Sequence, residues 1–398
     1  MALQVFQNGN GFLSTSQGFK TGPPPLYITA ETDDFDEVII QAWRDEGYNV
    51  QYIPFGDGGK AYTNTLKRLG DSLSIGESFA IVAFGDAAGI CLDVFQQKHT
   101  PRLCALVAYY PSTIPDPKNS FPNSFRVLVH LAGGVVGVRR NPEVLGIQGK
   151  KKTYRRKVGP GIGTGGFMKL GYPAYTYEGV ESGFAESDLD EYDKVAERVA
   201  WSRSLATIRK GFIAEVNIEV IKEQHTESRF RVSPDETVQK MAHKPFVNYV
   251  PTMTGGVGKK ELVRFYKEFF AKSNPPSMVM RLLSRTIGVD RVVDEIHISF
   301  KHTQEMYWML PGIPATDKQV EVAVVSVVAV RGGKLYSENV YWDQASVLMQ
   351  LGLLDPKYIP KNMRDKGIEE LPVWGAESAR RVVDEESEPS NELIVEWE

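Results

Sequence analysis

The apolar residues of this chain follow two different patterns, and the pattern changes at Gly211. Before Gly211, short apolar runs alternate with stretches of helical spacing. Such alternation indicates strands that are buried on both faces of a parallel sheet. After Gly211, helices come first and three long β runs follow, the last two joined by Gly332-Gly333 as a hairpin. We therefore expect an α/β domain followed by an α+β domain.

The two patterns also set the expected boundaries of the domains. We expect an N-terminal extension over residues 1–25, an α/β domain over 26–212, an α+β domain over 213–355 and an acidic tail over 356–398. A basic, glycine-rich insertion over residues 139–166 interrupts the first domain. The expected strands of the first domain are residues 26–29, 50–54, 78–84, 103–110, 125–131 and 172–177. In the second domain we expect helices at 235–242 and 258–271 and β runs at 291–310, 319–331 and 335–343.

Length, charge and cysteine content exclude several classes of protein. A chain of 398 residues is long enough for two or three domains, each with its own core. The net charge of −4 argues against a nucleic-acid partner. No stretch of 18 apolar residues and no signal-peptide pattern occurs, so we expect no membrane association and a cytoplasmic protein. Two cysteines, Cys91 and Cys104, are too few for a disulfide framework.

The first domain contains the pattern of a nucleophile elbow that lacks its nucleophile. A predicted strand, the segment Gly85-Asp86-Ala87-Ala88-Gly89 and a predicted helix follow one another. In α/β-hydrolases the middle residue of this pattern is the serine or cysteine that attacks the substrate. Here the middle residue is Ala87, whose methyl group cannot attack a carbonyl carbon.

Residues 26–211 resemble the dienelactone hydrolase family, which has the α/β-hydrolase fold. The segments that carry the resemblance are Tyr172-Pro173-Ala174-Tyr175, Glu181-Ser182-Gly183-Phe184, Ala200-Trp201-Ser202-Arg203 and the strand from Val127 to Gly133. In that family an E-H-G-F motif supplies the triad histidine, and Ser182 stands in its place here. The acid is expected just after Gly133, where the sequence continues with Gly134 and Val135. The resemblance therefore implies a degenerate triad at Ala87, Val135 and Ser182.

Two residues of this domain leave an alternative open. Cys91, one helical turn past the elbow, could act as a substitute nucleophile, although a helix cysteine is usually a small buried apolar residue. His130, at the end of a predicted strand, is a structural histidine or a displaced base. The first domain is accordingly expected to be a non-hydrolytic scaffold.

Residues 213–355 resemble the SnoaL-like branch of the NTF2-like superfamily. The segments that carry this resemblance are Phe246-Val247-Asn248-Tyr249, the turn from Met309 to Lys318, Gly333-Lys334-Leu335 and Tyr341-Trp342-Asp343. The resemblance implies a cone of curved antiparallel sheet and helices around an apolar pocket. Members of the superfamily differ in chemistry, so the fold alone does not define a reaction.

Three residues are candidates for acid–base chemistry in that pocket. In a strand that starts at Arg291, alternation places His302 on the same face as Ile298, Phe300 and other apolar residues, and His297 on the opposite face. Asp343 is an acid at the end of the last strand, or alternatively the N-cap of a helix. Tyr249 could donate a hydrogen bond to a ligand, or line the cavity wall.

The sequence predicts no metal and no cofactor. His297 and His302 point to opposite faces of a strand, and no H-x-H or H-E-x-x-H motif occurs. The glycines of residues 159–166 lack the lysine pattern of a phosphate-binding loop and suggest a flexible loop instead. The basic run over residues 150–157 is interpreted as a solvated insertion or an anion-binding patch.

The expected function is binding or acid–base transformation of a small hydrophobic molecule in the second domain. The resemblance suggests cyclisation, isomerisation or dehydration of a polyketide-like or lactone-like compound. The alternatives are a non-enzymatic interaction protein with vestigial pockets, and a carboxylic-ester or dienelactone hydrolase with an unrecognised nucleophile. Both faces of the run 319–331 are apolar, so we also expect a homodimer that covers the face outside the pocket.

Overall fold

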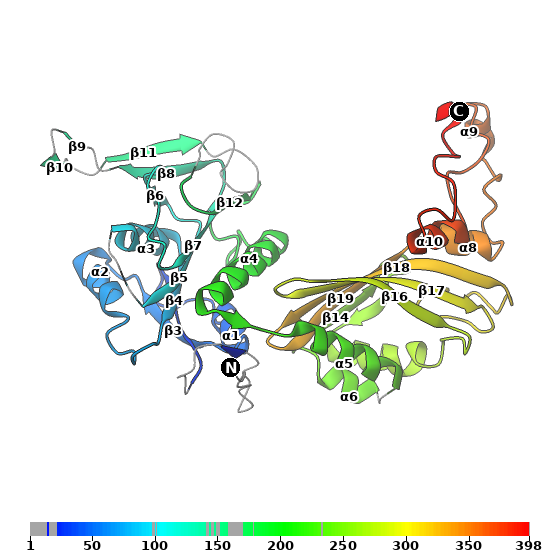
Figure 1. Ribbon diagram of the computed structural model, residues 1–398, viewed down its shortest axis with the longest axis horizontal. Coiled ribbons are helices and arrows are strands. Elements are labelled where there is room, and N and C mark those ends of the chain that lie inside the picture. Colours follow the sequence, from blue (N-terminus) through cyan, green and yellow to red (C-terminus); the bar gives the residue numbers. More distant parts are fainter. Residues whose placement is uncertain are drawn as a thin grey trace. The chain divides into compact units, whose positions relative to one another are not determined.

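The chain folds into two units in the computed structural model. The structure describes residues 14–15, 22–97, 100, 102–140, 143–144, 147–148, 152–157, 170–177, 179–231 and 234–397. One unit ends at Val216 and the second begins at Asn217 (Figure 1). The predicted boundary between residues 212 and 213 lies four residues before this division.

The N-terminal unit is built on a parallel sheet of six strands. Their order is β3 (Asn49–Pro54), β2 (Pro25–Ala30), β4 (Phe79–Phe84), β5 (Leu103–Tyr109), β7 (Arg126–Ala132) and β12 (Ala174–Tyr177). Every neighbouring pair is parallel. All residues of β4 and β5 are buried, as their unbroken apolar runs predict. The predicted α/β sheet is therefore confirmed.

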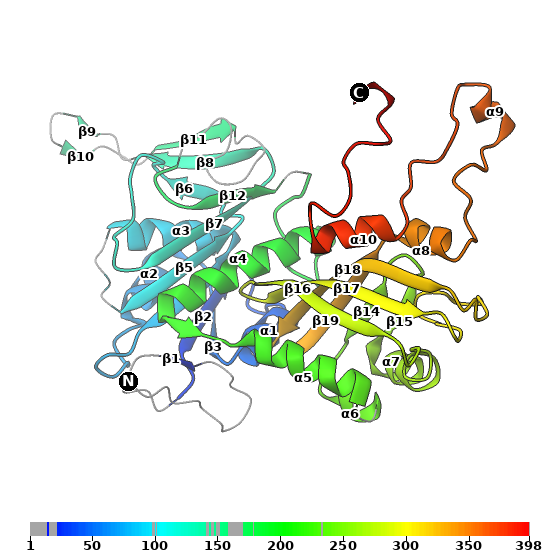
Figure 2. The same ribbon diagram turned by 45° about the vertical axis from the view of Figure 1, so that its right-hand side comes forward.

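Four helices pack against this sheet. They are α1 (Glu37–Asp45), α2 (Gly59–Arg68), α3 (Gly85–Gln97) and α4 (Lys194–Phe212). Figure 2 shows these helices beside the strands. Trp43 of α1 contacts Trp201 of α4, with ring centroids 4.6 Å apart, and Tyr62 of α2 contacts Cys91 of α3. Asp193 caps the long helix α4 by accepting hydrogen bonds from two backbone amides of its first turn.

The predicted insertion contains strands where it is described. β8 (Val135–Arg140) pairs with β11 (Lys152–Lys157) and β6 (Thr113–Pro115), and a short pair joins β9 (Glu143–Val144) and β10 (Ile147–Gln148). The glycine-rich segment 159–166 and the first two lysines of the basic run lie outside the described residues. Two-residue strands β1 (Ser14–Thr15) and β13 (Ala214–Glu215) also pair.

The C-terminal unit is built on a second sheet of six strands. Their order is β15 (Thr254–Val257), β14 (Phe246–Tyr249), β19 (Lys334–Trp342), β18 (Gln319–Arg331), β17 (Arg291–Lys301) and β16 (Val279–Ile287). All neighbours are antiparallel except β14 and β19, so the sheet is mixed rather than purely antiparallel. Gly332 and Gly333 form the predicted hairpin turn, both with positive φ.

The β run predicted for residues 291–310 ends at Lys301. Residues 302–310 form turns, in which Met306 pairs with Leu310 as an isolated bridge. Strand parity therefore applies as far as Phe300, and the burial of Trp308 has another cause. Strand β16 was not predicted, because most of its side chains are exposed and give no alternating pattern.

Helices lie on both faces of the second sheet. On one face are α5 (Ile218–Arg231) and α6 (Pro234–Gln239), followed by α7 (Gly258–Arg264) and a π-helical turn (Phe265–Phe270). On the other face are α8 (Gln344–Gln350) and α10 (Ala376–Val383), which both pack on β18 (Figure 1). The segment 356–398, expected to be a separate acidic tail, thus supplies a helix to this unit, together with α9 (Lys361–Arg364) and a 3₁₀ turn (Val395–Trp397).

Helix α10 bears on the predicted homodimer. The outer face of β18 was expected to need a partner subunit as a cover. In the structure Arg380 of α10 forms an ion pair of 2.9 Å with Glu321 on that face, so the chain covers part of it by itself. Val325 and Tyr341 on the same face stay 36% and 44% exposed. The homodimer remains a prediction. No helix in the described part of the chain has the length and apolar character to cross a membrane.

Candidate functional site

Helix α5 turns a partly charged face toward the sheet of the C-terminal unit. Ile218, Lys222 and His225 are buried, at the i, i+4, i+7 spacing of one helix face. The side chain of Lys222 is only 2% exposed, and α5 contacts β17, β18 and β19. A helix normally buries apolar side chains at such positions. The two basic residues therefore need acidic or polar partners on the sheet.

Glu338 on β19 is the central partner. Its side chain is fully buried, and its Oε1 accepts a hydrogen bond of 2.9 Å from the hydroxyl of Ser326 on β18. The ammonium group of Lys222 lies 3.5 Å from the same oxygen. The Nε2 atom of His225 lies 3.8 Å from the other carboxylate oxygen. One carboxylate thus faces a lysine, a histidine and a serine.

Asp294 on β17 is a second buried carboxylate in the same group. One of its oxygens is 3.9 Å from the Lys222 ammonium group. The guanidinium of Arg285, on β16, donates two hydrogen bonds to Asp294, of 2.7 and 3.0 Å. Arg285 also contacts Glu219 and Glu223 at 3.0 Å each, and these carboxylates raise the pKa of Arg285 above its ordinary value.

We call Lys222, His225, Asp294, Ser326 and Glu338 the inner polar cluster. Burying charged groups is unfavourable unless they are paired, and a buried pair often stabilises a fold less than apolar side chains would. The Lys222 separations of 3.5 and 3.9 Å exceed the roughly 2.7–3.2 Å of ordinary N–H···O hydrogen bonds. The cluster is thus a buried group of charged and polar side chains, a setting in which titratable groups often serve chemistry.

Asp343 has the alternative role that the sequence allowed. It is exposed and is the N-cap of α8, where its carboxylate accepts a hydrogen bond of 2.9 Å from the backbone amide of Ala345. The helix cap is therefore confirmed, and it explains the position of Asp343 without any ligand.

His302 is fully buried, as expected, but it lies in the turns after β17, where strand parity no longer applies. Its Nδ1 atom lies 3.1 Å from the hydroxyl of Thr316, and burial lowers its pKa. Its Nε2 atom is buried and has no hydrogen-bond partner among the described residues. His297 is on the opposite face, where it lies 3.5 Å from Glu321.

Tyr249 lies in an aromatic cluster. Its ring centroid is 5.2 Å from that of Trp308, and it also contacts Phe265, Phe270 and Trp342. The predicted trio of His302, Asp343 and Tyr249 thus occupies three different environments: a buried turn, an exposed helix cap and an aromatic core.

The sequence contained only part of the signal for the inner polar cluster. Asp294 stands on the inward face of the strand that nominated His302, and burial confirms that face. Lys222 and His225 belong to a helix that apolar periodicity did not reveal, because charged residues occupy its buried positions. Glu338 follows a register shift in the β18–β19 pairing at Ala329, which breaks simple alternation.

In the N-terminal unit the sharp turn after β4 lies two residues earlier than predicted. Helix α3 starts at Gly85, whose φ of 54° lies in the left-handed region. Ala87 is inside the first helical turn and fully buried. The residue at the strand-to-helix turn is therefore Gly85, and the assignment of Ala87 to the exposed elbow position was wrong. The five-residue pattern misled because its first glycine, not its middle residue, makes the turn.

The other two predicted triad positions are both exposed. Val135 is the first residue of β8 and is 53% exposed. Ser182 is exposed in the segment before α4. Val135 and Ala87 have apolar side chains, so neither could serve as a nucleophile, an acid or a base.

Acidic side chains gather instead at the carboxyl ends of β2, β4 and β5. Glu31 accepts a hydrogen bond from the backbone amide of Asp86, Asp86 contacts the hydroxyl of Ser112, and the hydroxyl of Tyr110 donates to Glu186. Burial raises the pKa of Glu186 to about 7 despite the bond from Tyr110, and nearby acidic groups contribute. Strand order reverses between β2 and β4, which is where open α/β sheets bind ligands.

His130 and Cys91 have structural environments. Both ring nitrogens of His130 have partners at 2.9 Å, Tyr177 and Ser204, and burial lowers its pKa to about 3. Cys91 is fully buried, and burial raises its pKa to about 12. A thiol with such a pKa is almost entirely protonated at neutral pH and is a weak nucleophile.

Among the described residues, no group of three or more His, Cys, Asp or Glu side chains has an arrangement that could hold a metal ion. The acidic side chains after β2, β4 and β5 instead contact a backbone amide and hydroxyl groups.

A known family matches part of the C-terminal unit. Residues 233–338 match the model of the SnoaL-like domain family. This range contains Asp294, Ser326 and Glu338, whereas Lys222 and His225 precede it. None of the curated proteins matches the chain. The dienelactone hydrolase-like character of the N-terminal unit stays a prediction.

Several solved structures are similar to a third of the chain. A candidate polyketide cyclase from Acidithiobacillus ferrooxidans is 23% identical, with 34% of this chain and 93% of that chain covered and a TM-score of 0.26. A protein named for its similarity to SnoaL-like polyketide cyclases, from Jannaschia sp. CCS1, is 13% identical, with 35% and 98% covered and a TM-score of 0.28. An NTF2-like protein of unknown function from Cytophaga hutchinsonii is 11% identical, with 32% and 100% covered and a TM-score of 0.23. The family match therefore shows that residues 233–338, about a quarter of the chain, are similar to SnoaL-like domains.

Proposed function

We propose that the C-terminal unit binds a small hydrophobic molecule with a carbonyl or enol oxygen and moves a proton on it. The proposal includes the polyketide-like and lactone-like compounds that the sequence suggested, and the reaction classes cyclisation, isomerisation and dehydration. The observation that carries it is the inner polar cluster, in which a buried lysine and two buried carboxylates lie between α5 and the sheet. The match to the SnoaL-like family supports the same location.

The geometry suggests a role for each residue. Glu338 is the proton acceptor and donor, because it is a fully buried carboxylate that faces a lysine, a histidine and a serine hydroxyl. Lys222 stabilises negative charge on the ligand oxygen, which would lie between its ammonium group and the carboxylates. His225 and Ser326 position Glu338, while the two hydrogen bonds from Arg285 hold Asp294 in place. His302, Tyr249 and Asp343 are not needed for these steps.

Access to the cluster requires movement of α5. Lys222, His225, Asp294 and Glu338 are all less than 10% exposed. A ligand therefore enters only when the helix moves away from β17 and β19. Hydrogen exchange of the α5 amides should consequently be faster than that of β17 and β18, and a bound ligand should slow it.

The experiment compares wild type with a double variant that removes the charges in a balanced way. In Lys222→Met/Glu338→Gln the central pair becomes neutral, while Asp294 retains Arg285 as its partner. The probe compounds are 1-naphthol, 1,8-dihydroxyanthraquinone and γ-valerolactone. Adding each of them should raise the melting temperature of the wild type. A ligand at 100 times its dissociation constant contributes about 2.7 kcal/mol. The double variant should fold and lose this shift, and equal shifts in both proteins would contradict the proposal.

We also propose that the N-terminal unit is a dienelactone hydrolase-like scaffold without hydrolytic activity. The residue at the strand-to-helix turn, Gly85, carries no nucleophile, and Cys91 is buried with a raised pKa. A serine- and thiol-reactive probe such as a fluorophosphonate or iodoacetamide should label the folded chain no faster than background. Rapid stoichiometric labelling would favour the alternative of a carboxylic-ester hydrolase.

One observation favours a second function, that of a non-enzymatic interaction protein. The inner polar cluster is sealed, and aromatic rings fill the region around Tyr249. In that case no probe would shift the melting temperature, and hydrogen exchange of α5 would be as slow as that of the strands.

A further inference from the structure

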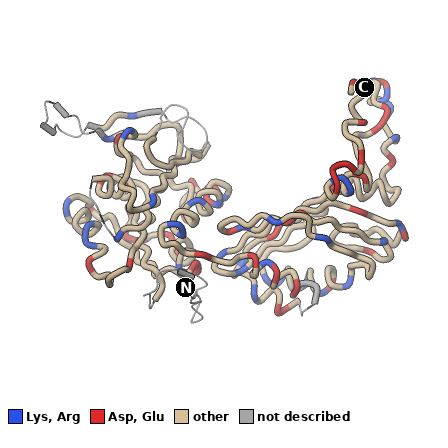
Figure 3. Tube along the Cα trace, in the orientation of Figure 1, with Lys and Arg blue, Asp and Glu red and all other residues tan. Residues whose placement is uncertain are grey.

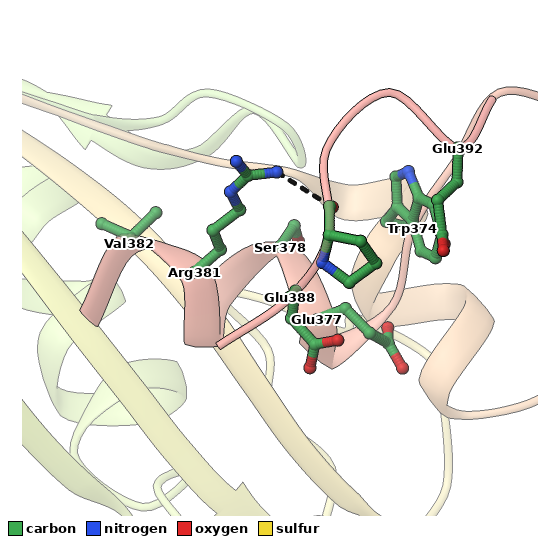
Figure 4. A pocket seen from close by; sticks show the side chains of 8 residues that line it. Trp374, Glu377, Ser378, Arg381, Val382, Glu388 and Glu392 are labelled. Carbon is green, nitrogen blue, oxygen red and sulfur yellow. Dashed lines mark hydrogen bonds between the residues drawn. The ribbon is translucent and has the colours of Figure 1, made fainter. Parts of the chain in front are cut away.

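The C-terminal segment forms a cavity with α10 that no part of the proposed chemistry uses. Its volume is about 300 Å³, at the lower end of the roughly 300–1,000 Å³ of small-molecule pockets. The residues that line it are Trp374, Glu377, Ser378, Arg381, Val382, Glu388, Pro389 and Glu392 (Figure 4). It lies on the opposite face of the sheet from the inner polar cluster, because α10 contacts Glu321 of β18 whereas the cluster contains Ser326.

The charge around this cavity is negative. Three carboxylates line it, against one guanidinium, and the acidic residues of the segment after Val382 are not interrupted by any Lys or Arg (Figure 3). Arg381 is already engaged, because it donates 3.0 Å to the carbonyl oxygen of Pro389 and also bonds the hydroxyl of Ser390. Arg380 pairs with Glu321. The neighbouring arginines therefore close the loop and anchor the helix, and the charges of Glu377 and Glu388 also act on Arg380.

Glu377 is the carboxylate that most needs a partner. Its Oε2 atom is buried, and no described residue provides a hydrogen-bond donor within reach of it. The oxygen packs against Gly375, where an added Cβ would come within 3.0 Å of it. An acceptor that is buried without a donor is unfavourable by about 1–3 kcal/mol, and more when it is charged. A cationic donor in the cavity would remove that penalty.

Trp374 provides an aromatic wall to the same cavity. Its side chain is only partly covered, with 36% of the residue exposed. Figure 4 shows Trp374 with Glu392 on one side of the cavity, and the carboxylates of Glu377 and Glu388 on its lower edge. An aromatic face next to carboxylates is the arrangement that attracts organic cations, because cation–π and ionic attraction act together.

We propose that this cavity binds an organic ammonium group, held by the Glu377 and Glu388 carboxylates and the ring of Trp374. The group belongs either to a free alkylamine or to a lysine side chain of a peptide. Both present the same small cation on an apolar stem. The site is separate from the inner polar cluster, so it does not depend on the acid–base function proposed above.

The test is isothermal titration of the full chain at low ionic strength, with tetramethylammonium, n-butylammonium and the peptide acetyl-Gly-Lys-Gly-amide as probes. We expect saturable binding that weakens with added salt. Glu377→Gln should weaken it about tenfold, since hydrogen bonds to charged groups contribute roughly 1.5–3 kcal/mol. Trp374→Leu should weaken it several-fold. Glu370→Gln is the matched control, because Glu370 is exposed in the same segment and outside the cavity.

The possible outcomes distinguish the two sources of the ammonium group from each other and from failure of the proposal. Tetramethylammonium has no N–H donor, so stronger binding of n-butylammonium and the peptide than of tetramethylammonium identifies an alkylammonium site. Binding of the peptide alone identifies a lysine side chain as the ligand. The proposal is overturned if no probe gives saturable heat, or if Glu370→Gln weakens binding as much as Glu377→Gln. Glu388→Gln provides a second lining variant, and melting curves of each variant establish that α10 is still folded.

Discussion

Lys222 on α5 and Glu338 on β19 face each other across 3.5 Å, and both side chains are almost completely buried. Neither residue lies on the surface, and they are 116 positions apart in the sequence. Two buried charges of this kind either take part in a reaction or determine how α5 docks on the sheet. The effects of substituting them on stability and on ligand binding can be measured separately.

Single substitutions at this pair should be strongly destabilising, and the double substitution should not. Lys222→Met removes the ammonium group that faces the buried Glu338 carboxylate, and Glu338→Gln removes the charge that faces the buried Lys222 ammonium group. Loss of one partner of a buried pair is unfavourable by about 3–5 kcal/mol, whereas joint replacement is close to neutral. Urea unfolding of the three variants provides the measurement.

The control for this pair is an exposed one. Arg264 and Glu268 are 3.1 Å apart, with side chains 71% and 51% exposed. A double-mutant cycle there should give a coupling of about 0.5 kcal/mol. Couplings of similar size at the two pairs would show that the buried location of Lys222 and Glu338 has no energetic consequence.

Glu186 should make the N-terminal unit less stable as the pH rises. Its pKa of about 7 in the folded unit lies above its ordinary value of 4.5, mainly because of burial. Between these two values the folded chain binds more protons than the unfolded chain, so stability falls as pH increases. Glu186→Gln should remove that part of the slope. Melting curves between pH 4.5 and pH 8 test this, with the exposed Glu181→Gln as the control that should keep the wild-type slope.

A side chain at Gly85 should be destabilising and should not create a hydrolase. The φ of 54° is unfavourable for other residues by about 1–2 kcal/mol, and an added Cβ would meet the carboxylate of Glu31. Gly85→Ser should therefore unfold at lower urea and hydrolyse p-nitrophenyl acetate no faster than wild type. Gly59→Ala is the matched control, because Gly59 has a φ of 66° with no atom within 4 Å of its added Cβ, and isolates backbone strain from the Glu31 contact. Vigorous hydrolysis by Gly85→Ser would mean that the missing base and acid are supplied by other residues.

Asp343 can be tested with two substitutions that separate a cap from a catalyst. Asparagine caps helices as well as aspartate does, while alanine removes the cap at about 1 kcal/mol. We expect Asp343→Asn to leave stability and ligand binding unchanged, and Asp343→Ala to lower stability only. Loss of turnover in Asp343→Asn, with normal stability, would restore the catalytic role suggested by the sequence.

The sequence predicted the parallel sheet well because its strands are short apolar runs between turn signals. The six strands of that sheet overlap the predicted ranges, and the hairpin at Gly332-Gly333 is where it was expected. Helix α5 and strand β16 were not predicted, since α5 buries Lys222 and His225 and β16 buries little. Apolar periodicity therefore detects neither α5 nor β16.

The candidate site was less predictable than the fold for the same reason. Parity found the inward face of β17, and with it Asp294, but the partners of Asp294 come from three other elements. Their proximity depends on the docking of α5 and on the β18–β19 register shift. Local sequence contains neither of these tertiary facts. The elbow was displaced by two residues because a glycine can make the turn itself, which a motif centred on a nucleophile does not anticipate.

Because α10 packs on β18, it limits which partners can bind the outer face of that strand. Any partner that approaches the outer face of that strand, including a second copy of the chain, must compete with a helix tethered to the same face. A short tether gives such a helix an effective concentration of roughly millimolar. Only a partner of greater affinity, or a protease that cuts between α8 and α10, would expose the strand. If the predicted homodimer forms through this face, chains clipped between α8 and α10 should dimerise at lower concentration than intact chains, which sedimentation would measure.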